Sequence, residues 1–287
     1  MKKIMLILKA MRPKQWIKNV FLFPAVLFSK EFLNPGDLLQ VFMGFLLFCG
    51  ASGAVYLVND IIDRDKDRLH PKKCRRPIAS GELAVKEAWV AALLILVCVG
   101  VLGFILSVPF AVVLCAYVII VFLYSTVLKK LAILDIMAIA AGFVLRTLAG
   151  AVVIDVQPSP WLLLCTSVLC LYLAANKRNA ELAVMKGDAG NYKASLQVYT
   201  PAFLNQIVTV CLSLSIVLYA LYTYFSATPL MMATTVFVIY GLFRYQLLIS
   251  KGEPGDSIEL VVLKDKPIII DAILWALTCV LLVWRFY

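Results

Sequence analysis

The 287-residue chain contains 63% hydrophobic and 15% charged residues, and it carries a formal net charge of +10 with a mean hydropathy of +0.93. Such a composition excludes an ordinary soluble domain. The positive charge does not indicate a nucleic-acid partner, because the cations lie where membrane topology alone requires them.

Apolar runs long enough to cross a bilayer recur along the chain and predict an all-α, polytopic integral membrane protein with a single domain over residues 1–287. Residues 1–15 predict a short interfacial segment, since the apolar stretch there is too short for a cleaved signal peptide and basic residues follow it. The first run is the weakest, because Lys18, Asn19 and Pro24 interrupt it. The nine predicted spans are 16–33, 38–58, 86–106, 109–127, 132–154, 160–178, 202–223, 229–249 and 267–286.

The distribution of cations predicts the orientation. Of the 27 Lys and Arg residues, only Lys30, Arg146 and Arg285 lie outside the N-terminal segment and the loops after spans two, four, six and eight. The positive-inside rule therefore predicts a plasma (inner) membrane protein whose N-terminus and charged loops face the cytoplasm, and an active site on that side. The eight Cys residues are scattered and include no CxxC pair, so no disulfide framework is expected.

The first inner loop carries the densest polar chemistry. Asp60, Asp63 and Asp67 follow i, i+3, i+7 spacing, and Asn59 falls on nearly the same face of a continuing helix. Carboxylates so close repel one another unless a cation lies between them, and Mg²⁺ prefers oxygen ligands of this kind. These four residues are the candidate metal ligands, for one ion or two.

Basic residues follow the aspartates directly. Arg68, His70, Lys73 and Arg76 are candidates for holding a multiply charged, phosphorylated substrate against the metal. His70-Pro71 should end the helix. A solvated loop that obeys the positive-inside rule would explain these cations, but it would not explain carboxylates at helical spacing.

The second inner loop holds Tyr124 and Lys129, followed by Asp135. Asp135 and Arg146 lie within the fifth span, where charge is expensive. Their spacing of eleven residues is close to three helical turns, so both can face one interior cavity and bind substrate. The alternative is a pair that serves helix packing or topology.

The remaining candidates lie in the third inner loop and before the first span. Lys177 and Arg178 extend the sixth span, and an ion pair of Lys177 with Glu181 on the helix surface is the alternative to substrate binding. The fourth inner loop, 251–266, is either a lid or a solvated segment. The candidates for a lipid phosphate at headgroup level are Gln15, Lys18 and Asn19.

Several of these motifs are similar to those of a known superfamily. The pattern Asn59-Asp60-x-x-Asp63-x-x-x-Asp67 resembles the first aspartate-rich motif of the UbiA-type membrane prenyltransferases. Further patterns look like the branch of this superfamily that joins phosphoribosyl diphosphate to decaprenyl phosphate. They are Arg12-Pro13-x-Gln15-Trp16-x-Lys18-Asn19, Asp67-Arg68-x-His70-Pro71-x-Lys73-x-x-Arg76-Pro77 and Tyr124-Ser125-x-x-Leu128-Lys129.

The resemblance implies nine transmembrane helices around a central cavity open to the cytoplasmic side. It also implies a Mg²⁺-dependent transferase of cell envelope biosynthesis, with phosphoribosyl diphosphate and a polyprenyl phosphate as substrates and pyrophosphate as product. The residues that it implies for Mg²⁺ and the diphosphate are Asn59, Asp60, Asp63 and Asp67. Those that it implies for contacts with phosphates or ribose are Lys73, Arg76, Tyr124, Lys129, Lys177 and Arg178. One departure concerns the second aspartate motif of this superfamily, which is commonly DxxxD. Here Asp135 is followed four residues later by Ile139 and not by a second aspartate.

Two other functions are weighed against this one. A UbiA-type enzyme that moves a prenyl diphosphate onto an aromatic or other small acceptor is the nearer, although the missing second aspartate and the extra cations count against it. A transporter for an anionic solute is less favoured, because the ionisable residues cluster at the membrane edge rather than at mid-depth. The oligomeric state is left open, and an oligomer is compatible with the sequence.

Overall fold

The computed structural model describes residues 2–69, 71, 73–184, 194–225, 228–251 and 264–286, and these residues form helices only. Eight helices are long and apolar enough to cross a membrane. They are α3 (Pro35–Ile62), α5 (Val85–Leu106), α6 (Val108–Thr126), α7 (Leu134–Val152), α8 (Pro160–Val184), α9 (Pro201–Tyr224), the pair η7 (Pro229–Thr234) and α10 (Thr235–Ser250), and α12 (Lys266–Phe286). Each begins and ends within a few residues of a predicted span.

The first predicted span, 16–33, differs from the rest. It forms the 3₁₀ helix η1 (Pro13–Leu22), the short α2 (Pro24–Leu27) and a second 3₁₀ turn, η2 (Lys30–Leu33), and not one long α-helix. Pro24 explains the break, because its ring removes one helical hydrogen bond and fits only the first turn of a new helix. The described residues thus contain eight long helices where nine spans were predicted.

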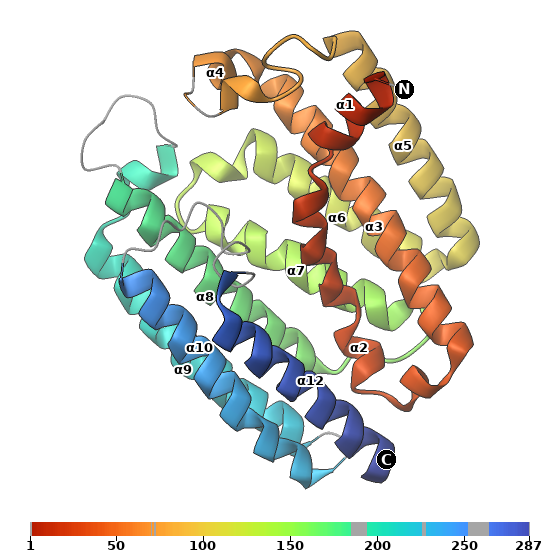
Figure 1. Ribbon diagram of the computed structural model, residues 1–287, viewed down its shortest axis with the longest axis vertical. Helices are drawn as coiled ribbons and strands as arrows, with labels where there is room; N and C mark the ends of the chain where they lie inside the picture. Colours follow the sequence, from red (N-terminus) through yellow and green to blue (C-terminus); the bar gives the residue numbers. More distant parts are fainter. Residues whose placement is uncertain are drawn as a thin grey trace.

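This irregular segment nevertheless occupies a central place. η1 contacts both α3 and α7, and in Figure 1 the red chain runs from α1 (Lys2–Ala10) through η1 to α2 along the middle of the bundle. Gly150 of α7 permits the close approach, because a Cβ there would lie 1.8 Å from the backbone oxygen of Leu22. η1 therefore fills the seam between α3 and α7.

The hydrophobic core has two main parts that share α7. One part joins η1, α2, α3, α6 and α7 around Phe48, Phe110 and Tyr117. The other joins α7 to α8, α9, α10 and α12, with Tyr172 and Leu204 fully buried. The outward faces of α5, α9 and α12 expose large apolar side chains along their length, which suits contact with lipid and not with water.

The described parts of the segments that follow α3, α6 and α8 form short helical turns. α4 (Arg64–Leu69) and η3 (Lys73–Arg75) follow α3, η4 (Leu128–Lys130) follows α6, and η6 (Ala194–Gln197) precedes α9. α4 ends at Leu69, as the predicted helix stop at residues 70 and 71 requires. α4 lies at the upper edge in Figure 1, beside the inner ends of α3 and α5.

Candidate functional site

The predicted aspartate segment bends within the motif. α3 ends at Ile62, Asp63 lies in a turn, and α4 begins at Arg64, so the expected single helix from 59 to 67 is two helices. Helical hydrogen bonds continue through the bend, since the Asp63 N–H donates to the Asn59 carbonyl at 2.9 Å and the Asp67 N–H to the Asp63 carbonyl at 2.8 Å. The backbone of the motif consequently stays helical on both sides of Asp63.

A network of cations holds two of these aspartates. Asp60 and Asp67 are almost completely buried. The Arg76 guanidinium bridges them through one nitrogen, Nη1, which donates to Asp60 Oδ1 at 3.1 Å and to Asp67 Oδ2 at 2.5 Å. Arg12 also donates to Asp60, and its guanidinium lies 4.8 Å from the centre of the Tyr56 ring. Two buried carboxylates are thus neutralised by two guanidinium groups, as burial of charge requires.

The third aspartate pairs with a cation from the second inner loop. Lys129 Nζ lies 3.0 Å from each carboxylate oxygen of Asp63. The two residues come from η4 and from the end of α3, so this ion pair joins two inner loops. The predicted convergence of cations from different loops on the aspartates is therefore present for Arg76 and Lys129.

A second polar cluster surrounds Asp135 at the start of α7. Its carboxylate accepts from Arg178 Nε and from the Tyr199 hydroxyl, both at 2.6 Å. Arg178 is fully buried and also donates to Tyr124 at 3.0 Å and to Glu181 at 2.6 Å. Burial and the hydrogen bond to Asp135 raise the pKa of Tyr199, so the phenol stays protonated at neutral pH. Asp135 and Arg178 therefore satisfy one another inside the protein.

Arg146 lies in a third cluster and does not join Asp135. It donates to Asn19, to the Gly142 carbonyl and to the Tyr117 hydroxyl, each at 2.8 Å. Asn19 is fully buried and also donates to Cys49 Sγ at 3.3 Å. The cluster therefore connects η1 to α7, and it places Asn19 in the interior, away from the headgroup position predicted for it.

The other predicted residues lie at varied depths. Arg68 is exposed and donates to the Ala79 carbonyl at 3.1 Å. Gln15, Lys18, Lys73 and Lys177 are half-buried. His70 lies outside the described residues, as does most of the predicted lid, 252–263.

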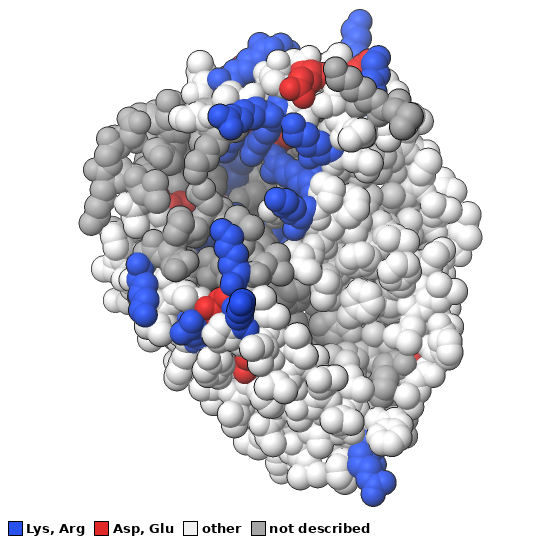
Figure 2. All heavy atoms as spheres, viewed as in Figure 1, with Lys and Arg blue, Asp and Glu red and all other residues white. Residues whose placement is uncertain are grey.

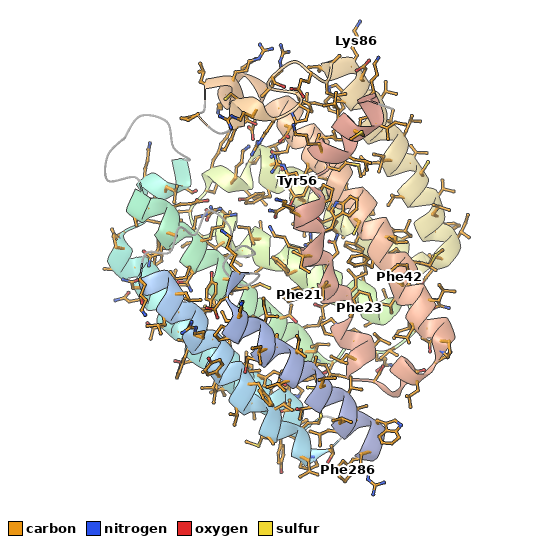
Figure 3. All side chains as sticks on the ribbon, viewed as in Figure 1. Phe21, Phe23, Phe42, Tyr56, Lys86 and Phe286 are labelled. Atoms are coloured by element: carbon orange, nitrogen blue, oxygen red, sulfur yellow. The ribbon has the colours of Figure 1, made fainter. Side chains whose placement is uncertain are left out.

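Lys and Arg side chains gather around one hollow of the molecule. Figure 2 shows them between the α4 end and the middle of the bundle, while most of the surrounding face carries neither charge. In Figure 3, Tyr56 of α3 lies near the upper end of η1, and Phe21 lies farther along that segment. The hollow thus carries a concentration of basic side chains on a face that is otherwise largely uncharged.

The donor set fits Mg²⁺ in its chemistry. In the described part of the chain, no group of three or more His, Cys, Asp and Glu residues is arranged to hold a metal, because each aspartate faces a cation instead. Asn59 Oδ1, however, is buried and has no hydrogen-bond partner among those residues. An orphaned amide oxygen beside three carboxylates is a hard-oxygen set of the type that Mg²⁺ selects.

Sequence reasoning missed two residues of the site. Arg12 stood in a recognisable pattern but was not among the candidate ligands, although its position ahead of Pro13 at the start of η1 was a usable signal. Tyr199 gave no signal, since a single Tyr before a predicted span is ordinary. Its role depends on contacts with residues more than sixty positions earlier in the chain.

The fold defines a multi-pass integral membrane protein, with paired acidic and basic side chains where its long helices end. The sequence profile of the UbiA prenyltransferase family matches residues 20–263, so the chain belongs to that family and is a transferase.

Relatives agree with this assignment. The decaprenyl-phosphate phosphoribosyltransferase of Corynebacterium glutamicum is 33% identical, over 96% of this chain and 86% of the relative. That of Mycolicibacterium smegmatis is 32% identical, over 94% and 89%. The fold is similar to a UbiA homolog from Archaeoglobus fulgidus bound to GPP and Mg²⁺, with a TM-score of 0.73, 18% identity, and coverage of 97% of this chain and 99% of that one.

Proposed function

We propose that this transferase moves the 5-phosphoribosyl group of phosphoribosyl diphosphate onto a polyprenyl phosphate and releases pyrophosphate. The observation that carries the proposal is the similarity, over nearly the whole chain, to enzymes named decaprenyl-phosphate phosphoribosyltransferase. The cations paired with the aspartates supply the physical support, because both substrates are anions and must approach one another.

Mg²⁺ would be held by Asn59, Asp60, Asp63 and Asp67, the residues whose oxygens fit it. When bound, Mg²⁺ would neutralise the negative charge that develops on the departing diphosphate. The chain's own cations then have a second use. Arg76 and Lys129 donate to these carboxylates, and they would bind the substrate phosphates when the carboxylates hold the metal.

The transfer itself requires little from protein acid–base groups. An oxygen of the lipid phosphate attacks C1 of the ribose while the bond from C1 to the diphosphate oxygen breaks, and pyrophosphate leaves with that electron pair. A phosphate monoester is already ionised at neutral pH, so no general base is needed. The sequence, with its one His residue, suits such a mechanism. The work of the chain is positioning and screening of charge.

The same proposal covers the arrangement in the membrane. The N-terminus and the cationic hollow face the cytoplasm, because most of the cations lie in the N-terminal segment and in the loops that follow α3, α6, α8 and α10. η1 and α2 complete a ninth crossing around the central cavity. A cytoplasmic site suits a soluble, multiply charged donor, and the apolar helix faces suit the lipid acceptor.

A second function draws on the family and on one structural neighbour. The UbiA homolog from Archaeoglobus fulgidus holds GPP and Mg²⁺, which favours prenyl transfer to a small acceptor as the alternative. Against it stands the second aspartate motif, because Asp135 is followed four residues later by Ile139 and the second carboxylate of that motif is missing.

The test is a direct comparison of donors. Purified protein in detergent is incubated with Mg²⁺, polyprenyl phosphate and labelled phosphoribosyl diphosphate, and in parallel with a labelled prenyl diphosphate and an aromatic acid. We expect label in the lipid fraction only in the first reaction, and none without polyprenyl phosphate. Product only in the second reaction would replace the proposal with prenyl transfer.

A further inference from the structure

Two buried hydroxyl groups contact the turn that carries Lys129. One comes from η6 and the other from the residues between η6 and α9. Ser195 Oγ donates to the Lys129 carbonyl oxygen at 3.1 Å, and the Tyr199 hydroxyl accepts from the Ile133 N–H at 2.6 Å. Ser195 is fully buried and Tyr199 is nearly so. The segment before α9 is therefore hydrogen-bonded to the backbone of residues 129–133 at both ends.

The turn of residues 129–133 has a backbone conformation that it would not adopt readily by itself. Ile133 has φ 70° and ψ −52°, which is unusual for a β-branched residue. Such a conformation persists only where surrounding contacts determine it. The Tyr199 hydroxyl is one such contact, because it accepts from the Ile133 N–H while it donates to Asp135 in the same helix turn.

The turn determines where Lys129 stands. Lys129 belongs to η4, its carbonyl is held by Ser195, and its ammonium group reaches both oxygens of Asp63 on the other inner loop. A shift of the turn would change the side-chain conformation that Lys129 needs to reach both oxygens of Asp63, because charged hydrogen bonds need nitrogen–oxygen distances near 2.7–3.2 Å.

We infer that Tyr199 and Ser195 are positioning residues, which hold the 128–135 turn so that Lys129 stands opposite the aspartates and in place for a substrate phosphate. Tyr199 does not have to touch the substrate for this role, since both hydrogen-bonding functions of its hydroxyl are used within the turn. The kinetic consequence rests on the proposed function, whereas the placement of Lys129 does not.

The kinetic test removes only the hydroxyl. Tyr199→Phe keeps the ring that stacks on Phe203, and we expect the KM for phosphoribosyl diphosphate to rise about five- to tenfold while kcat changes less, as for a lost hydrogen bond to a positioning group. Ser195→Ala should change the KM in the same direction, and it serves as the readout if Tyr199→Phe does not fold.

Tyr172→Phe is the matched control. Tyr172 lies in the same part of the core, and its buried hydroxyl donates to Gln246 at 2.9 Å, far along the chain from the aspartates. This variant should lose stability without a change in KM. If Tyr199→Phe and Ser195→Ala keep the wild-type KM, or change it no more than Tyr172→Phe does, Tyr199 and Ser195 are structural residues only.

A second readout needs no substrate. Acetylation of lysines with a water-soluble reagent, followed by mass spectrometry, compares Lys129 with the exposed Lys86 in the same molecule. In Tyr199→Phe we expect Lys129 to react several-fold faster relative to Lys86, because its ion pair is loosened. Unchanged relative reactivity overturns the inference. Faster reaction in a protein that lacks phosphoribosyl transfer keeps the inference and removes the proposed function.

Discussion

Lys129 of η4 and Asp63 at the end of α3 form a bidentate ion pair, with the ammonium nitrogen 3.0 Å from both carboxylate oxygens. The pair connects the loop after α3 to the loop after α6, and these two loops carry the strongest sequence motifs. It also sets a proposed metal ligand and a proposed phosphate ligand in competition, because Lys129 and Mg²⁺ would bind the same carboxylate.

Replacing Lys129 should therefore move two affinities in opposite directions. In Lys129→Met, we expect a several-fold gain in Mg²⁺ affinity in the absence of substrate, since Asp63 is no longer neutralised. The KM for phosphoribosyl diphosphate should rise by roughly 10- to 100-fold, as for loss of a charged hydrogen bond worth about 1.5–3 kcal/mol. Calorimetric titration with Mg²⁺ and steady-state kinetics measure the two quantities.

The neighbouring lysine provides a charge-matched control. Lys130 is exposed in the same 3₁₀ turn, so Lys130→Met removes an equal charge from the same loop. Both affinities should stay close to the wild-type values in this variant. Equal behaviour of the two variants would mean that the net charge of the loop, and not the contact with Asp63, determines binding.

Neutralising Asp63 should abolish turnover and leave the fold intact. We expect Asp63→Asn to lower kcat by roughly a thousand-fold, which corresponds to about 4 kcal/mol of metal-dependent stabilisation. Stability should change little, because the ion pair with Lys129 is partly exposed and such pairs contribute about 0–1 kcal/mol. Asp65→Asn is the control, since the Asp65 side chain is 90% exposed. Near-normal turnover of Asp63→Asn, or full wild-type activity in excess chelator, would remove Asp63 from a metal site.

The pair of Asp135 and Arg178 should behave as a structural unit. Both side chains are fully buried, so Asp135→Asn leaves a guanidinium without its carboxylate and should cost about 3–5 kcal/mol of unfolding free energy. Arg178→Gln should cost a similar amount, and the double variant much less than the sum of the two. Unfolding in mixed micelles measures the cycle. Additive losses, or a raised KM with unchanged stability, would instead favour the predicted contact of Asp135 with substrate.

Local spacing predicted much of the site, because motifs at helical intervals need no knowledge of the distant chain. Asp60 and Asp67 meet at Arg76, nine residues after Asp67, whereas Asp63 pairs with Lys129. The long helices also followed directly from the apolar runs, since length and hydropathy determine them.

The remaining features depend on contacts between distant segments. Asn19 looked like a headgroup ligand because it follows Lys18, but it is buried against Arg146 of α7. The spacing of Asp135 and Arg146 predicted that both face one cavity. In the structure Asp135 pairs with Arg178, and Arg146 donates to Asn19. Eleven residues of helix rise about 16 Å, too far for both side chains to meet one small ligand.

The close approach of η1 to α7 leads to a prediction about a single methyl group. In Gly150→Ala the new Cβ would lie 1.8 Å from the Leu22 oxygen and 2.7 Å from its carbonyl carbon. Backbone atoms cannot rotate away, so η1 must move. We expect a loss of about 3 kcal/mol or more, at or above the usual cost of overpacking. Activity should fall with stability, because η1 follows Arg12 and carries Asn19, which contact Asp60 and Arg146.

Gly100→Ala makes the same change where there is room. Gly100 lies within α5, and a Cβ there would meet nothing within 4 Å. Alanine is the better helix former, so this variant should gain up to about 1 kcal/mol. Thermal unfolding in detergent, read together with phosphoribosyl transfer, separates the two substitutions. Equal stability of the two variants would show that η1 does not rest on Gly150, and the packing of the first segment between α3 and α7 would need another explanation.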